Sequence, residues 1–146
     1  MLDINYSINN TTYLQIYEHL TLCDKSFIPI LSERVSIDKY SKKIFDYAIR
    51  FEAFFGTKLI GLIAAYKHSS LSEIFITNVS IDVDYVRKNV ATDLLSKLIA
   101  YSVNNNFKVI KLEVNNDNKK AIYFYKKHNF IHVETNLDIL IFKLNL

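Results

Sequence analysis

The sequence predicts a mixed α/β fold in which a β-sheet of about six to seven strands is flanked by helices. Two segments near the start repeat apolar residues at helical spacing, and β-forming residues take over from residue 50 onward. The second half then alternates strand, helix and strand, an order that predicts a right-handed β-α-β crossover. With 146 residues, 50% of them hydrophobic, and no repeat or linker, residues 1–146 are expected to form a single domain.

The first half of the chain predicts two helices and then three strands. The helices cover residues 11–22 and 36–48, where apolar residues recur at helical spacing. Thr11 or Thr12 is the expected N-cap of the first helix, and Ser36 of the second. The stretches RFEAFF and KLIGLIAAY predict a hairpin around GTK, and SEIFITNVSID predicts a further strand.

The second half predicts two helices and three strands. TDLLSKLIAYSVNN has one apolar face and predicts a helix, whereas KVIKLEVN alternates apolar and charged residues as a strand does. KKAIYFYKKH predicts a short helix, and FIHVE and LDILIFKLNL predict the last two strands. The predicted order is therefore αα-ββ-β-α-β-α-β-β.

Composition narrows the class of partner. The chain has only 2 Gly and 1 Pro, so its turns must rely on Asn, Asp and Ser. A net charge of +3 is too small to predict nucleic-acid binding. The single Cys23 excludes an internal disulfide and suits a reducing compartment. Because no signal pattern or membrane-length apolar run is present, a cytoplasmic protein without membrane partners is expected.

Two stretches of the second half carry the functional signal. The first, DYVRKNVATDLL, follows the strand-like IFITNVSI and opens a helix. Such a junction presents main-chain N–H groups that can hold phosphate, although taken alone it is more often an ordinary turn. The second stretch, NKKAIYFYKKHNF, directly follows the strand KVIKLEVN.

Together these stretches resemble the GNAT superfamily of acyl-CoA-dependent N-acetyltransferases over residues 50–133. That family opens a helix with an Arg/Gln-x-x-Gly-x-Gly/Ala loop, here residues 86–91. Ala91 matches, whereas Val86 replaces the Arg or Gln and Asn89 replaces the first Gly. The second family pattern is matched in register by Asn118, Ala121, Tyr125 and Phe130, with Asn129 in place of a Gly.

The resemblance implies that the chain binds acetyl-CoA as acyl donor and needs no metal. Tyr125 would be the general acid that protonates the departing thiolate, although a tyrosine on such a helix is more often a packing residue. Asn118 would contact the pantetheine arm, or serve only as a helix cap. The implied cofactor-binding residues are Val79 and Ile81 (through backbone N–H), Val86, Arg87, Lys88, Asn89, Val90, Ala91, Thr92, Asn118 and Tyr125.

The residues of the loop fit phosphate binding without glycine. Asn89 tolerates a positive φ, and Ala91 is small enough for a ligand to approach closely. Arg87 and Lys88 supply positive charge, and the Thr92 hydroxyl adds a donor. Because Val86 removes a long polar side chain, weaker acyl-CoA binding than in typical relatives is a reasonable hypothesis.

The acceptor and the general base are less defined. The acceptor pocket is expected near Arg34, Tyr40, Arg50 and Glu52, and the base could be Glu73, Asn78, Ser80 or Glu113, none of them favoured. The stretches LSERVSIDKYSKKI, GLIAAY and FITNVSI also resemble acetyltransferases found among bacterial surface-sugar genes. That likeness implies an amino-sugar acceptor, with other small amines and peptide N-termini left open.

The leading hypothesis is an N-acetyltransferase that moves an acetyl group from acetyl-CoA to a primary amine of a small molecule. The amine would attack directly in a ternary complex, and a homodimer is compatible with the sequence. The alternative is a non-catalytic acyl-CoA-binding sensor or scaffold with the same fold. Val86 and Asn89 favour that alternative, whereas Tyr125 favours catalysis.

Overall fold

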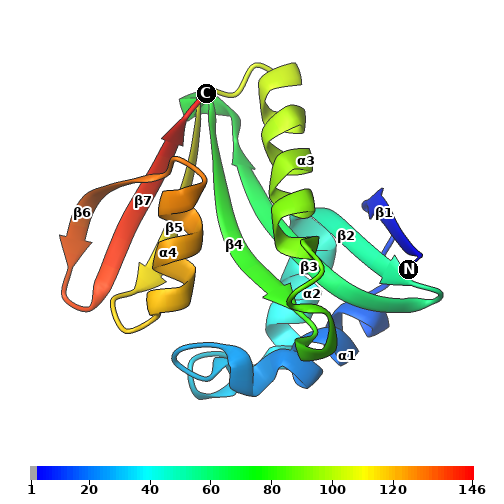
Figure 1. The fold of residues 1–146 in the computed structure, drawn as a ribbon. Helices are drawn as coiled ribbons and strands as arrows, with labels where there is room; N and C mark the ends of the chain where they lie inside the picture. The colour runs from blue at the N-terminus through cyan, green and yellow to red at the C-terminus, as the bar shows by residue number, and fades with distance from the viewer. Residues whose placement is uncertain (1–2) are drawn as a thin grey trace.

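The computed structural model describes residues 3–146, which form one seven-stranded mixed sheet with helices on both faces (Figure 1). The strand order across the sheet is β1-β2-β3-β4-β5-β7-β6. The strands are β1 (Ile4–Ile8), β2 (Ile49–Phe55), β3 (Lys58–His68), β4 (Glu73–Ile81), β5 (Val109–Asn115), β6 (Ile131–Asn136) and β7 (Ile139–Asn145). The helices are α1 (Tyr13–Cys23), α2 (Ile37–Tyr47), α3 (Val90–Asn104) and α4 (Lys119–Lys127).

This architecture confirms the predicted fold class and corrects the predicted order at one point. The chain begins with a strand, β1, which pairs antiparallel with β2 and precedes α1. The predicted helix caps are found at Thr12, which forms a capping box with Gln15, and at Ser36, which accepts from Lys39 N–H. No helix among residues 3–146 is long and apolar enough to cross a membrane.

The core lies in two layers, one on each face of the sheet. On one face α1 and α2 cover β2 and β3 through residues such as Ile16, Leu20 and Ile44. On the other face α3 and α4 pack through residues such as Leu94, Leu98 and Tyr125. Burial of these apolar side chains on both faces stabilises the fold.

The sheet splits between its two central strands, β4 and β5. Their parallel pairing runs only from Glu73 and Val109 to Ile76 and Leu112. Beyond those residues the strands diverge, and α4 lies beside β5 on the far side of the gap (Figure 1). The second half of β4 is therefore paired with β3 alone, so its other edge is free for a ligand.

A β-bulge in β4 decides which side chains face this gap. Ala64 of β3 pairs with Asn78, whereas the next residue, Ala65, pairs with Ile76, so Thr77 is the extra residue. Because of this extra residue, the side chains of β4 that follow it switch to the opposite faces of the sheet. After the bulge Asn78 and Ser80 are buried, while the adjacent Val79 and Ile81 pack against the core cluster of α3.

Candidate functional site

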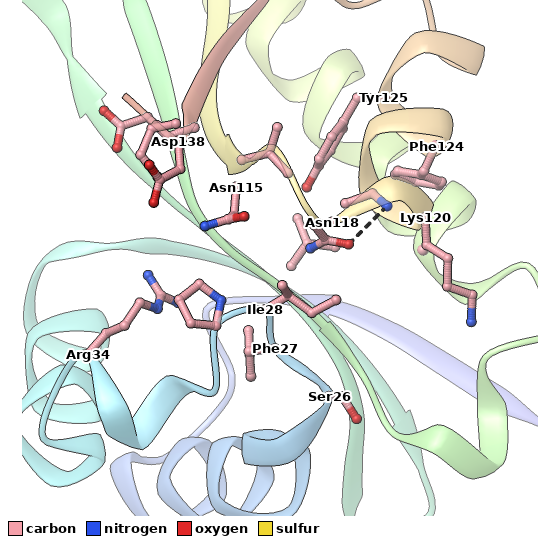
Figure 2. A pocket seen from close by; sticks show the side chains of 17 residues that line it. Ser26, Phe27, Ile28, Arg34, Asn115, Asn118, Lys120, Phe124, Tyr125 and Asp138 are labelled. Carbon is pink, nitrogen blue, oxygen red and sulfur yellow. Dashed lines mark hydrogen bonds between the residues drawn. The ribbon is translucent and has the colours of Figure 1, made fainter. Parts of the chain in front are cut away.

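A cavity of about 550 Å³ opens where β4 and β5 diverge. Figure 2 shows the segment that joins α1 to α2 on one side of it and α4 on the other. Two short 3₁₀ turns, Asp24–Ser26 and Leu31–Glu33, shape that joining segment. The lining residues are Ser26, Phe27, Ile28, Pro29, Arg34, Val79, Ala91, Glu113, Val114, Asn115, Asn118, Lys120, Ala121, Phe124, Tyr125, Asp138 and Ile139.

Tyr125 supplies a phenol at the centre of this cavity. Its ring is only 7% exposed and packs edge-on against Phe124 and Phe130, at centroid distances of 5.4 and 5.6 Å. Its hydroxyl points into the cavity between Asn115 and Asn118 (Figure 2). Burial raises the pKa of Tyr125 well above its ordinary value, so the phenol keeps its proton at neutral pH. The aromatic cage therefore presents a fixed O–H donor to whatever occupies the cavity.

The free edge of β4 presents main-chain donors to the same space. Asp82 N–H donates to Ile60 O on β3 at 2.8 Å. Because N–H groups alternate in direction along a strand, those of Val79 and Ile81 point away from β3, toward the gap. Val79 lines the main cavity, and both residues line an adjoining cavity of about 290 Å³ that reaches Val83 and Val86. The sequence predicted these two N–H groups as cofactor contacts.

The loop from Asp82 to Asn89 carries the chain from β4 into α3. Asp82 Oδ1 accepts from Asp84 N–H at 3.0 Å, and Asp82 Oδ2 lies 2.9 Å from Lys58 Nζ. Asn89 adopts the left-handed conformation, with φ 60° and ψ 19°, as its substitution for glycine predicted. Its side chain does not cap α3, so it leaves the helix N-terminus open.

The first turn of α3 offers an anion site. Its hydrogen-bond ladder starts with Asp93 N–H to Asn89 O at 3.0 Å, so the N–H groups of Val90, Ala91 and Thr92 precede the ladder. Unpaired N–H groups and the positive end of the helix dipole favour phosphate at this place. Coenzyme A carries such phosphates, and the chemistry of these donors fits it.

The predicted cofactor residues divide into two groups in the structure. Val79, Ile81, Val86, Ala91, Asn118 and Tyr125 line one or both cavities. Arg87, Lys88, Asn89, Val90 and Thr92 lie on the loop and first helical turn beyond the cavity walls. Val90 is buried and contributes to the core, and the Thr92 hydroxyl lies 3.4 Å from His128 Nε2. The second group can reach a phosphate only at the outer end of the site.

Asn118 has the two roles that the sequence left open. Its side chain caps α4 by accepting from Ala121 N–H at 3.2 Å, and it also lines the cavity (Figure 2). The amide N–H₂ remains available because the cap uses only the side-chain oxygen. Asn118 therefore fixes the start of the helix that carries Tyr125 and still offers a donor to a ligand.

The four candidates for a general base lie in different environments in the structure. Glu73 forms an ion pair with Lys111 at 2.9 Å, where β4 begins. Asn78 and Ser80 are buried and hydrogen-bonded to each other at 2.7 Å. Of the four candidates, Glu113 lines the main cavity and is exposed.

The expected acceptor pocket needs a correction. Arg34 does line the cavity, but Arg50 and Glu52 are 7% and 0% exposed and belong to a structural cluster. Glu52 accepts from Ser7 Oγ and from the backbone N–H groups of Asn10 and Thr11, which fastens β1 and the start of α1 to the sheet. Arg50 and Glu52 are both buried in β2, and neither lines the main or the adjoining cavity. Tyr40 is also structural, since its hydroxyl donates to Thr77 O at 2.7 Å.

Sequence reasoning missed Asp138 and the wall formed by Phe27, Ile28 and Pro29. Asp138 lies in the turn between β6 and β7, and Asn116 N–H donates to Asp138 O at 2.8 Å, which brings that turn to the end of β5. Only the pairing of β5 with β7 places this turn at the cavity. Among residues 3–146, no cluster of three or more His, Cys, Asp or Glu side chains could hold a metal ion.

Comparison with known proteins agrees with this geometry. The model of the acetyltransferase (GNAT) family matches residues 13–130. Streptothricin acetyltransferase A of Bacillus subtilis (strain 168) is 39% identical over 56 residues, a match that covers 38% of this chain and only 32% of that protein.

Solved structures show the same fold. The PaiA N-acetyltransferase of Thermoplasma acidophilum in complex with coenzyme A has a TM-score of 0.78 at 15% identity, with 97% of this chain and 99% of that chain covered. The ribosomal-protein-S18-alanine N-acetyltransferase of Escherichia coli has a TM-score of 0.74 at 18% identity, with 98% and 94% covered. Because the family model spans most of its length, this chain belongs to the acetyltransferase (GNAT) family.

Proposed function

We propose that this acetyltransferase moves an acetyl group from acetyl-CoA to a primary amine of a small molecule, with amino-sugars among the candidate acceptors. The observation that carries the proposal is the Tyr125 hydroxyl, which points into a cavity bounded by the free edge of β4. A phenol beside unpaired main-chain donors suits acyl transfer from a thioester, because the phenol can protonate the thiolate and the N–H groups can stabilise the oxyanion.

Acetyl-CoA would lie along the gap between β4 and β5. The N–H groups of Val79 and Ile81 would pair with the pantetheine arm and stabilise the oxyanion that develops on the thioester carbonyl. The phosphates would lie at the N-terminus of α3, with Lys120 near the adjoining cavity as a further positive charge. The family relatives solved with coenzyme A support this choice of donor.

The chemistry follows from this placement. The neutral amine attacks the thioester carbonyl, so an N–C bond forms as the C–S bond breaks. The departing sulfur takes the proton of the Tyr125 phenol, and the phenolate regains a proton from solvent. The amine nitrogen loses its own proton through water at the open end of the cavity. The products are the acetamide and free coenzyme A, with no covalent enzyme intermediate.

The acceptor is proposed from the cavity and from the relatives. The lining mixes polar groups with the apolar wall of Phe27, Ile28 and Pro29, which suits a small polar molecule with an apolar face. The name of the Bacillus subtilis relative supports an acceptor that is also a small molecule. Peptide N-termini are the competing class, since the Escherichia coli neighbour acts on a ribosomal protein.

Substitution of Tyr125 by Phe tests the proposal. The change removes only the hydroxyl, and we expect kcat to fall about 10²- to 10⁴-fold on an accepted amine, which is the usual contribution of a general acid. Release of the coenzyme A thiol measures the rate, and a calorimetric titration with coenzyme A should show nearly unchanged binding.

Tyr123→Phe is the matched control. Tyr123 lies on the same helix two residues earlier, is 71% exposed and lines neither cavity, so its variant should keep wild-type activity. Unchanged turnover in Tyr125→Phe would refute the acid role. Tight coenzyme A binding without turnover on a broad set of amines would favour the sensor or scaffold alternative.

A further inference from the structure

The main cavity is divided by charge. Figure 2 shows Arg34 and Asp138 on one side of Tyr125 and Lys120 on the other. Glu113 lines the cavity too, and on β5 it lies two residues before Asn115, which adjoins the turn that holds Asp138. One end thus carries a lysine toward the proposed phosphate site, whereas the opposite end carries two carboxylates and one guanidinium.

The three charged side chains at the second end are not used by the fold. Arg34, Glu113 and Asp138 are all exposed, and none of them takes part in an ion pair within residues 3–146. If Arg34 served to neutralise the carboxylates, its nitrogens would lie within ion-pair distance of one of them. The cavity instead presents positive and negative charges that are separate from one another.

A buried group indicates that this end holds the reacting ligand. Tyr125 is only 7% exposed, and its hydroxyl points into the cavity. Burial raises the pKa of the Tyr125 phenol, and no hydrogen bond contributes to that shift. The buried ring thus fixes a hydroxyl that faces the open cavity and is available to a ligand there. The charges beside it are therefore placed to orient an acceptor.

We infer that the acceptor is a primary amine that also carries a carboxylate or a phosphate group. Its amino group would lie near Glu113 and Asp138, and its anionic group would bind the Arg34 guanidinium. The ammonium form would lose a proton to water before attack, and the proton released after attack would pass through water to one of the two carboxylates. A planar guanidinium forms paired hydrogen bonds with a carboxylate or a phosphate, so the inference covers both anionic groups. This inference rests on the proposed function, because it assigns a substrate class to the same site.

The test uses matched pairs of amines that differ in the anionic group. Glucosamine 6-phosphate is compared with glucosamine, and lysine with its decarboxylated form, cadaverine. Each is titrated by calorimetry into the wild-type protein saturated with coenzyme A, or into the free protein if coenzyme A does not bind. We expect at least one anionic amine to bind about ten- to a hundredfold more tightly than its partner, the usual value of a charged hydrogen-bonded contact. The pair of amines that shows this difference in affinity tells whether the site prefers a phosphate or a carboxylate.

Variants assign the effect to Arg34. Arg34→Gln should reduce the preference to near parity, whereas Lys25→Gln, which removes the same charge from an exposed residue outside both cavities, should preserve it. Equal binding within both pairs, a preference for cadaverine, no binding of either anionic amine, or an unchanged preference in Arg34→Gln would each overturn the inference. Selective, Arg34-dependent binding without acetyl transfer would refute the proposed reaction and, with it, the assignment of these amines as acceptors, whereas acetyl transfer without selective binding would overturn the inference alone.

Discussion

A buried histidine makes the stability of this protein depend on pH in a predictable direction. His19 of α1 is 2% exposed, and its Nε2 lies 2.9 Å from Ser80 Oγ on β4. Ser80 Oγ in turn donates to Asn78 Oδ1 at 2.7 Å, so the ring is held in a short chain of polar groups against β4. Burial lowers the pKa of His19 from 6.5 to about 4, because a charged imidazolium would lose its hydration.

The sign of the effect follows from proton binding. Between these two pKa values the unfolded chain binds a proton at His19 and the folded chain does not. The contribution to the free energy of unfolding is therefore complete above the unfolded pKa and is lost as pH falls through the window. On going from about pH 7.5 to about pH 5, the loss from this one site is about 2 kcal/mol.

Urea unfolding of wild type and His19→Gln at both pH values measures this loss. Glutamine does not titrate, so the pH-dependent loss in the free energy of unfolding should be about 2 kcal/mol smaller in His19→Gln than in wild type over the same interval. His68→Gln is the control, since His68 is exposed at the end of β3 and should leave the wild-type dependence unchanged. Equal pH dependence in wild type and His19→Gln would refute the reasoning.

Two further substitutions test how the proposed phosphate loop is positioned. In Gly61→Ala the new Cβ would lie 2.7 Å from Val90 Cγ1, so the start of α3 must shift. We expect a loss of about 1–3 kcal/mol in unfolding experiments together with weaker coenzyme A binding, and wild-type values for both would contradict this packing. Asn89→Val should cost about 1–2 kcal/mol, because a β-branched residue is strained at positive φ, whereas Asn89→Gly should be neutral or stabilising in the same assay.

The sequence was most informative where hydrophobic periodicity was long. The helices and the six strands from β2 onward were predicted within a few residues, because the helices repeat apolar residues at helical spacing and the strands are rich in β-forming residues. β1 was missed although Ile4, Tyr6 and Ile8 alternate with polar residues, because five residues give a weak signal. Its identity as a strand depends on long-range contacts, such as pairing with β2 and the bonds from Glu52 to Ser7.

The site divides in the same way. Tyr125 and Asn118 were singled out by their register with the family pattern, and both line the cavity. Asn89 adopts the predicted left-handed conformation, which depends on its local backbone alone. Asp138 could not be found, since a turn between two late strands reaches the cavity only through the order β5-β7-β6. Arg50 and Glu52 were misplaced for the related reason that a charged pair on a strand predicts a polar site but not which face of the sheet is covered.

The few glycines of this chain distinguish two needs that glycine usually meets together. Positive φ is met by asparagine at Asn9, Asn89, Asn106 and Asn129, where a side chain finds room. Gly61 has no such conformational demand, yet any Cβ there would collide with the first residue of α3, so space alone requires it. It follows that Asn89 supplies the positive φ needed at the start of α3. The close approach of α3 to the sheet is made possible by Gly61 on β3. A phosphate loop can therefore lose its glycine without losing its shape, provided that the ligand contacts main-chain N–H groups beyond the Asn89 side chain.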